Sequence, residues 1–131
     1  MSGFSNYTQN AILNWLKGSP MPTAPSALYV ALFNGDPTDA GSGGDDVTTD
    51  IRPEGRVAAT FGAVTGNTSI ANSAEVDFGA SAGSATVSHF AVYDAASGGN
   101  MLGSAALASS QSVAADNLVK FAVGALTITV S

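Results

Sequence analysis

The feature that most constrains the fold is an apolar strand pattern at residues 87–93, which a polar turn follows at once. Its apolar side chains fall on both faces of the expected strand, with Phe90 and Val92 on one face and Val87, Ala91 and Tyr93 on the other. A strand covered on one face alternates apolar and polar residues, so this pattern predicts cover on both faces. The small and glycine-rich residues 94–100 predict a turn, and residues 101–107 then return as an antiparallel partner.

Apolar patterns of strand length recur along the rest of the chain, between turns rich in glycine and polar residues. The further strands that we expect are residues 28–33, 56–61, 74–78, 118–123 and 126–130. The side chains expected to face inward are Ala74, Val76 and Phe78 in one strand and Leu126, Ile128 and Val130 in the last. Short strands at even spacing predict a mainly β fold, an antiparallel β-sandwich of about seven strands with one N-terminal α-helix.

The N-terminal segment 1–18 is expected to hold that helix, because apolar residues recur there at helical spacing behind possible caps. Trp15 and Leu16 are expected to cover one end of the sheet core, or alternatively to dock on a partner protein. A sandwich has one interior and so covers only one face of the 87–93 strand. We expect its second face, with Val87, Ala91 and Tyr93, to be covered by Trp15 and Leu16 or by a contact between subunits.

After an extended, proline-rich connector at residues 19–25, residues 26–131 are expected to form the β-sandwich. Within it, the stretch 36–55 is rich in glycine and acidic residues and predicts a long exposed loop. No repeat or linker divides the sequence, so we expect residues 1–131 to form a single domain.

The composition argues against several classes of partner. The chain has 4 basic and 10 acidic residues and a net charge of −6, which argues against binding to a phosphate backbone. No apolar run approaches the roughly 20 residues of a membrane helix, and no basic stretch precedes an apolar one as in a secretory signal. With only 11% charged residues, the surface favours contacts with other protein.

The residues that could carry catalysis do not form a recognisable constellation. Gly79–Gly83 matches the Gly-x-Ser-x-Gly pattern around Ser81, but a strand follows it where a nucleophile elbow needs a helix. The only histidine, His89, has apolar neighbours on its strand and is expected to be a hydrogen-bonded structural residue. We therefore expect no enzyme and no cofactor.

The acids of the 36–55 stretch are the candidates for a cation site, because hard cations prefer carboxylate oxygens. Asp36, Asp39, Asp45, Asp46 and Asp50 do not follow the alternating register of a calcium loop. We therefore expect a solvated acidic loop and no metal site.

Three stretches together resemble a known family: LYVALFNGDPTDAG from Leu28, HFAVYDAASGGNML from His89 and GALTITV from Gly124. They are similar to small structural proteins of tailed bacteriophages, which are often labelled phage tail fibre proteins. The likeness runs from the N-terminal helix to the last strand and includes no catalytic residues. It implies a virion component that is made in the cytoplasm of the bacterial host.

Compact size and low charge lead us to expect a capsid decoration (cement) protein, a homotrimer that binds the lattice of the major capsid protein. The alternative is a tail fibre, tail-tip or baseplate component involved in host attachment, with tail proteins as its partners. The residues expected to dock on other virion proteins are Trp15, Leu16, Asp39, Asp45, Asp46 and Arg52. Neither nucleic acid nor a membrane is an expected partner.

Overall fold

The computed structural model describes residues 3–130, which form ten strands and two helices. In chain order these are β1 (Gly3–Phe4), α1 (Asn6–Leu16), β2 (Leu28–Asn34), β3 (Asp45–Asp46), α2 (Thr48–Ile51), β4 (Val57–Ala59), β5 (Ser69–Ala71), β6 (Val76–Ala80), β7 (Ala85–Tyr93), β8 (Met101–Val113), β9 (Leu118–Phe121) and β10 (Thr127–Thr129). The predicted fold class, mainly β with one principal helix near the N-terminus, is confirmed. The strands outnumber the expected seven because β1, β3 and β5 are too short to leave a periodic pattern.

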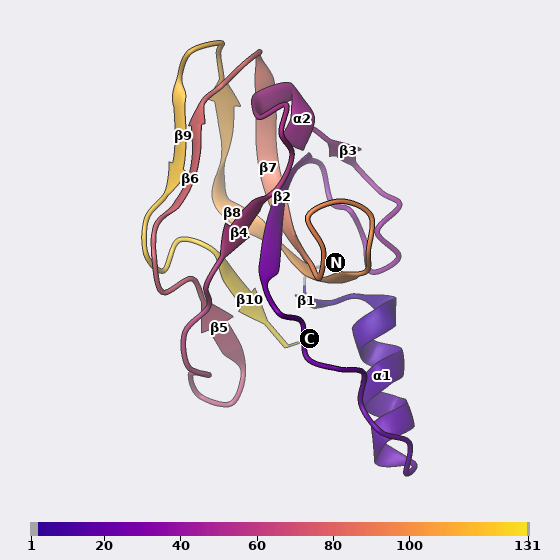
Figure 1. Ribbon diagram of the computed structural model, residues 1–131. Helices are drawn as coiled ribbons and strands as arrows, with labels where there is room; N and C mark the ends of the chain where they lie inside the picture. Colours follow the sequence, from indigo (N-terminus) through magenta and orange to yellow (C-terminus); the bar gives the residue numbers. More distant parts are fainter. Residues whose placement is uncertain (1–2, 131) are drawn as a thin grey trace.

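The strands form two layers, and all of their pairings are antiparallel (Figure 1). The main sheet has the order β1-β8-β7-β2-β3, and β4 pairs with the first half of β2 on the same edge as β3. Two separate ribbons, β6 with β9 and β5 with β10, form the other layer. The central β7–β8 hairpin is the one that the opening strand pattern predicts.

The main core lies between these layers, and strand alternation accounts for most of it. Phe90 and Val92 of β7 are buried there with Val30 and Leu32 of β2. Val76 and Phe78 are also buried, whereas Ala74 precedes β6 and is exposed, contrary to the prediction. In the last strand Leu126 and Ile128 are buried as expected, but Val130 lies beyond the end of β10 and is exposed.

A buried asparagine joins the two ribbons of the second layer. Asn72 donates to the carbonyl oxygens of Ala74 and Ala122, each at 2.9 Å, and its own carbonyl oxygen accepts the Leu126 amide at 2.9 Å. A buried amide side chain with all of these bonds satisfied fixes the three segments relative to one another.

The prediction that residues 36–55 form one exposed loop is wrong for their second half. Val47, Thr48 and Ile51 are buried, and α2 begins and ends among them. The Thr48 hydroxyl oxygen accepts a hydrogen bond from the Leu32 amide at 2.9 Å. It takes the place of the backbone acceptor that a further strand paired with β2 would provide. Val47 and Ile51 belong to the core, but the acidic residues around them made this segment resemble a solvent-exposed loop.

The predicted faces of β7 are correct for Ala91 and wrong for Val87. Val87 pairs with Gln111 and His89 with Ala106, so the four residues 107–110 of β8 stand opposite Ser88 alone. This bulge breaks the two-residue period, and Val87 joins the main core with Phe90.

A second, smaller cluster covers the other face of the main sheet. It consists of Ala31, Phe33, Ala91 and Met101, with Tyr93 packed against it. The loop between β2 and β3 approaches it closely, since a Cβ atom at Gly41 would lie 3.6 Å from the Met101 Sδ atom. Cover on both faces is therefore confirmed, but this loop supplies it here, not Trp15 and Leu16.

Arg56 holds the turn between β7 and β8 against this face. Its guanidinium carbon lies 3.5 Å from the centre of the Tyr93 ring. Its Nη1 atom donates to the carbonyl oxygens of Ala95 and Gly98, each at 2.8 Å. One side chain therefore joins the residue before β4 to two residues of the glycine-rich turn.

Replacing Arg56 with alanine is expected to lower the free energy of unfolding by about 1–3 kcal/mol, since a cation–π contact and two charge-assisted hydrogen bonds are lost. Arg56→Lys keeps the charge but not the planar guanidinium that stacks on the Tyr93 ring, so it should recover only part of this loss. Urea unfolding of the three proteins measures the difference, and equal midpoints for wild type and Arg56→Ala would refute the role.

Tyr93, whose ring lies against Arg56, should make the folded protein less stable at alkaline pH. Burial raises the pKa of the Tyr93 hydroxyl above its ordinary value of 10.0, although the nearby Arg56 acts in the opposite direction. The unfolded chain therefore loses this proton at a lower pH than the folded chain. The stabilisation is complete below about pH 10 and is lost as the pH rises through the folded pKa. Urea midpoints between pH 8 and 11 should fall less steeply for Tyr93→Phe than for wild type; parallel curves would contradict this assignment.

Candidate docking surface

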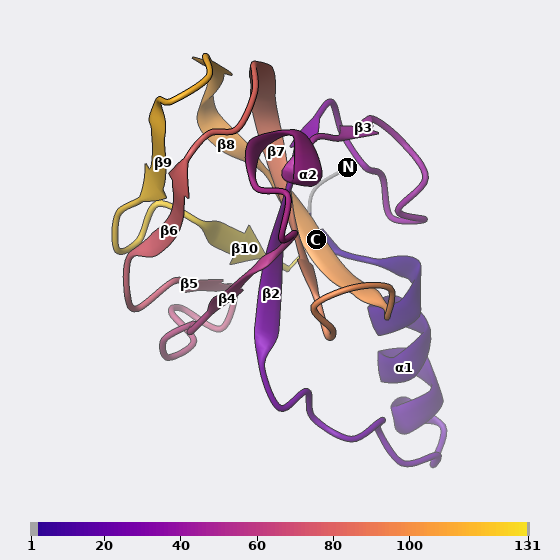
Figure 2. The ribbon, with the colours of Figure 1, turned by 45° about the horizontal axis from the view of Figure 1, so that its top comes forward.

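The helix α1 projects from one end of the sandwich (Figures 1 and 2). Its first turn is anchored, because Ser5 accepts the Thr8 amide at 3.2 Å through its side chain and donates its own amide to Leu102 at 3.0 Å. The Asn6 amide donates to the Asp39 carbonyl oxygen at 2.8 Å. The helix ends at Leu16 with Lys17 as its C-cap, and the next residue, Gly18, takes a positive φ of 113° that favours glycine.

Beyond this anchor α1 has almost no cover. No residue of α1 is buried, and the side chains of Leu13, Trp15 and Leu16 are 64%, 57% and 67% exposed. The prediction that Trp15 and Leu16 cover the end of the sheet core is therefore wrong. Three large apolar side chains on one exposed helix end are typical of a protein contact site. We call Leu13, Trp15 and Leu16 the helix tip.

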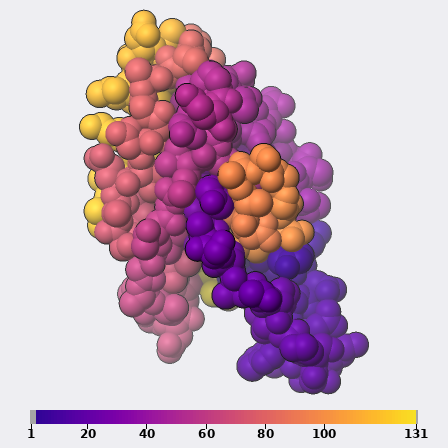
Figure 3. Space-filling view, viewed as in Figure 1, coloured from indigo at the N-terminus to yellow at the C-terminus, as the bar shows by residue number. Residues whose placement is uncertain are grey.

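An apolar cleft of about 440 Å³ separates α1 from the sandwich. Its walls come from α1, from the proline-rich segment 21–25 and from strands β1, β2, β5, β7, β8 and β10. Figure 3 shows the hollow between the N-terminal segment and the part of the molecule that carries β5. Tyr7 and Met21 line the cleft and are themselves exposed, so the apolar surface continues from the body toward the helix.

The six residues predicted to dock do not form one surface. Trp15 and Leu16 lie near the C-terminal end of α1, whereas β3 and α2 lie at the far end of the main sheet (Figure 1). Asp45 is exposed on β3. Arg52 is engaged locally, because its Nη1 atom donates to the carbonyl oxygens of Gly55 and Arg56 at 3.0 and 2.9 Å.

One carboxylate oxygen of Asp46 and one of Asp39 make structural contacts. Asp46 accepts the amide of Thr48 at 2.9 Å and its hydroxyl at 2.6 Å, which fixes the start of α2. Asp39 accepts the side-chain amide of Gln9 at 3.1 Å, beside the first turn of α1. Asp39 is therefore the one predicted acid that the structure brings close to the helix.

Leu13 of the helix tip, and Tyr7 and Met21 of the cleft, were absent from the predicted set. The available signal was composition: residues 6–16 contain no charged side chain, and Met21 lies between Pro20 and Pro22.

The residues with catalytic potential make local hydrogen bonds. The buried Ser81 hydroxyl donates to the Gly83 carbonyl oxygen at 2.6 Å, inside the turn between β6 and β7. His89 lies with its Nδ1 atom 2.9 Å from the Ser88 hydroxyl. Among residues 3–130, no group of three or more His, Asp or Glu side chains is arranged to hold a metal ion. No helix in this part of the chain is long and apolar enough to cross a membrane.

The fold and the surface together define a small β-sandwich module with a helix that exposes apolar side chains near its C-terminal end. The family model described as Podophage GP4 fiber I protein gp80 matches residues 3–129. The chain therefore belongs to this family of bacteriophage fibre proteins, and the resemblance to phage structural proteins is confirmed. A comparison with curated proteins found no match.

Proposed function

We propose that this protein is a non-enzymatic structural component of the fibre apparatus of a tailed bacteriophage. The observation that carries the proposal is the family match, which spans residues 3–129 and so includes both α1 and the sandwich. It favours the alternative that we derived from the sequence, a component of the tail, over decoration of the capsid. The local hydrogen bonds of Ser81 and His89 support a role without catalysis.

In this proposal α1 attaches the module to another virion protein. The anchored first turn sets the direction of the helix, and the helix tip stays available for a partner. The partner that suits it is a protein with an apolar groove, because an uncharged helix gains most of its binding energy from burial of large side chains. The sandwich then acts as the rigid body that this helix holds in place.

Antibody labelling of purified particles tests the location. Gold-conjugated antibodies raised against the sandwich should label the tail end of intact particles in negative-stain electron micrographs. Antibodies against the major capsid protein provide the control for access to the shell. Labelling spread evenly over the capsid would contradict the fibre assignment and restore the decoration hypothesis.

A further inference from the structure

We infer that a protein whose apolar groove receives the helix tip is a second copy of this chain. Because this names a partner of the attachment surface, it rests on the proposed function. The groove is the apolar cleft of about 440 Å³ between α1 and the sandwich. Each chain therefore carries both halves of the contact, an exposed apolar tip and an open apolar cleft.

The helix tip does not reach the cleft of its own chain. The residues of α1 that line the cleft all lie in the first half of the helix, whereas the helix tip lies in the second half and lines none of it. The first turn is held to the sandwich through Ser5, so the tip projects beyond the cleft (Figures 1 and 2). A tip that fills this cleft therefore belongs to another molecule.

The cleft matches the helix tip in polarity. Large apolar side chains from both layers of the sandwich line it, namely Leu28, Ile70, Val92, Leu102 and Ile128. Large apolar residues gain most of their binding energy when such a surface takes them out of water. The cleft therefore offers the helix tip the burial that it lacks in the single chain.

The charges of the two surfaces are also complementary. Lys17 follows the helix tip directly and is the only charged residue between positions 3 and 35. Among the described residues that line the cleft, only Asp94 is charged. Its carboxylate accepts the backbone amide of Asn100 at 2.8 Å and the side-chain amide at 3.1 Å, and neither donor is charged. A tip seated in the cleft brings Lys17 toward Asp94, which favours association of two chains that each carry a net charge of −6.

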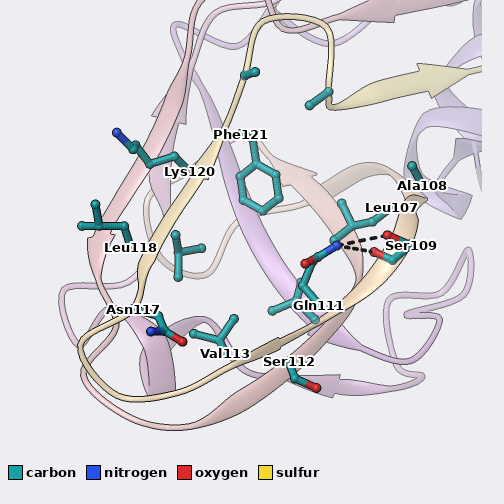
Figure 4. Close-up of a pocket in the computed structure, with 14 residues that line it drawn as sticks. Leu107, Ala108, Ser109, Gln111, Ser112, Val113, Asn117, Leu118, Lys120 and Phe121 are labelled. Carbon is teal, nitrogen blue, oxygen red and sulfur yellow. Dashed lines mark hydrogen bonds between the residues drawn. The ribbon is translucent and has the colours of Figure 1, made fainter.

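A second hollow suits the helix tip less well. This groove of about 490 Å³ lies between β8 and β9. Polar side chains form much of its lining, and Figure 4 shows Gln111 donating to Ser109 there. An apolar side chain placed over these groups would separate them from water at a cost in free energy. The charged residue in the described lining is Lys120, which would repel Lys17.

The contact joins two different surfaces, so the copies meet head to tail and not about a twofold axis. Head-to-tail contacts either close into a ring, as in the homotrimer expected from the sequence, or form an open row. The open row agrees with the proposed function, because one helix tip stays free at its end for attachment to the particle.

Light scattering during size exclusion of the purified chain tests this contact without a particle. Wild type should give masses above that of one chain, and they should rise with concentration. The tip variant, Trp15→Gln with Leu16→Gln, and the cleft variant, Met21→Glu, should each weaken association by about tenfold or more. All three positions are exposed, so both variants should fold.

Leu118→Glu is the matched control for these variants, because Leu118 is 68% exposed and lines the second hollow instead of the cleft. It should associate as wild type does. A monomeric wild type, or association that only Leu118→Glu abolishes, would overturn the contact. Neither result would affect the fibre assignment, which antibody labelling of particles tests separately.

A mixture of the tip variant and the cleft variant distinguishes this contact from others that use the same helix. The tip variant keeps an intact cleft and the cleft variant keeps an intact tip, so one productive contact remains. Each variant alone should be monomeric, and the equimolar mixture should give a species of two chains. If helix tips packed against each other, or bound only a different protein, the mixture would stay monomeric and the inference would fail.

Engineered cysteines keep the test decisive if either variant fails to fold. The chain has no cysteine, so a disulfide reports only the introduced pair. Leu16→Cys copies mixed with Thr23→Cys copies, whose cysteine lines the cleft, should form a disulfide-linked pair of the two variants under mild oxidation. Leu16→Cys mixed with Leu118→Cys should not. Equal cross-linking in both mixtures, or none in either, would contradict the contact.

Discussion

Replacing Ile51 with alanine is expected to lower the free energy of unfolding by about 2–5 kcal/mol, the range for a large-to-small change in a packed core. Ile51 has no exposed surface and belongs to the main core cluster. Its backbone is held at both ends, by the Val47 carbonyl oxygen and by the Ala82 amide. The site cannot collapse easily around a smaller side chain, which favours the upper part of this range.

Chemical denaturation followed by circular dichroism measures the effect. Val64→Ala is the control, because it removes a similar apolar side chain from an exposed position, and its effect should stay within about 0.5 kcal/mol. If Ile51→Ala were as stable as Val64→Ala, residues 47–51 would be a surface loop after all, and the two-layer core described above would be wrong.

Changing Trp15 and Leu16 together to glutamine should weaken attachment to the particle by about 100-fold or more, because large apolar residues at a contact carry most of its binding energy. Glutamine is a good helix former, so α1 should persist in the variant. Both side chains are exposed in the isolated protein, and the variant should therefore unfold at nearly the wild-type temperature.

Particles that lack the protein can be mixed with purified wild type, with the double variant and with Val64→Gln as a control for surface apolar residues. Co-sedimentation then compares the bound fractions. Binding of the double variant at the wild-type level would show that the helix tip is not the attachment site. Equal loss of binding by Val64→Gln would show that the effect is not specific to the helix.

The parts of the fold that could be predicted are those with unbroken periodicity. The alternation of Val76, Asp77 and Phe78 predicts β6, although the strand begins two residues later than expected, and the two-sided apolar pattern of β7 correctly predicts a strand covered on both faces. These patterns work because each side chain follows directly from the strand geometry. The polar turn at residues 94–100 was also evident from its small residues and glycines.

The parts that were missed depend on contacts between distant segments. From the sequence, Thr48 is expected to be a polar loop residue. In the structure it is buried, and its hydroxyl oxygen accepts the hydrogen bond from the Leu32 amide that a neighbouring strand would otherwise accept. Val87 reads as part of the outer face of β7, but the bulge in β8 turns it into the main core. Neither event leaves a local signal, because each depends on a partner strand whose register the sequence does not show.

The candidate site was predicted in part. Trp15 and Leu16 stood out as apolar residues on a short helix, but their exposure depends on the direction of α1. The direction is set by the bonds of Ser5 and Asn6 to Leu102 and Asp39, which join segments far apart in the chain. The charge of the acids in the 36–55 stretch suggests a binding surface. In the structure, however, Asp39 and Asp46 make hydrogen bonds that stabilise the local fold.

The number of copies per particle tests the fibre assignment most directly. Purified virions can be digested and the peptides of this chain quantified against those of the major capsid protein by mass spectrometry with isotope-labelled standards. A fibre component should be present in a handful of copies per particle, because a tailed virion has a single tail. Hundreds of copies, in a simple ratio to the major capsid protein, would contradict the fibre assignment and show that the protein decorates the capsid.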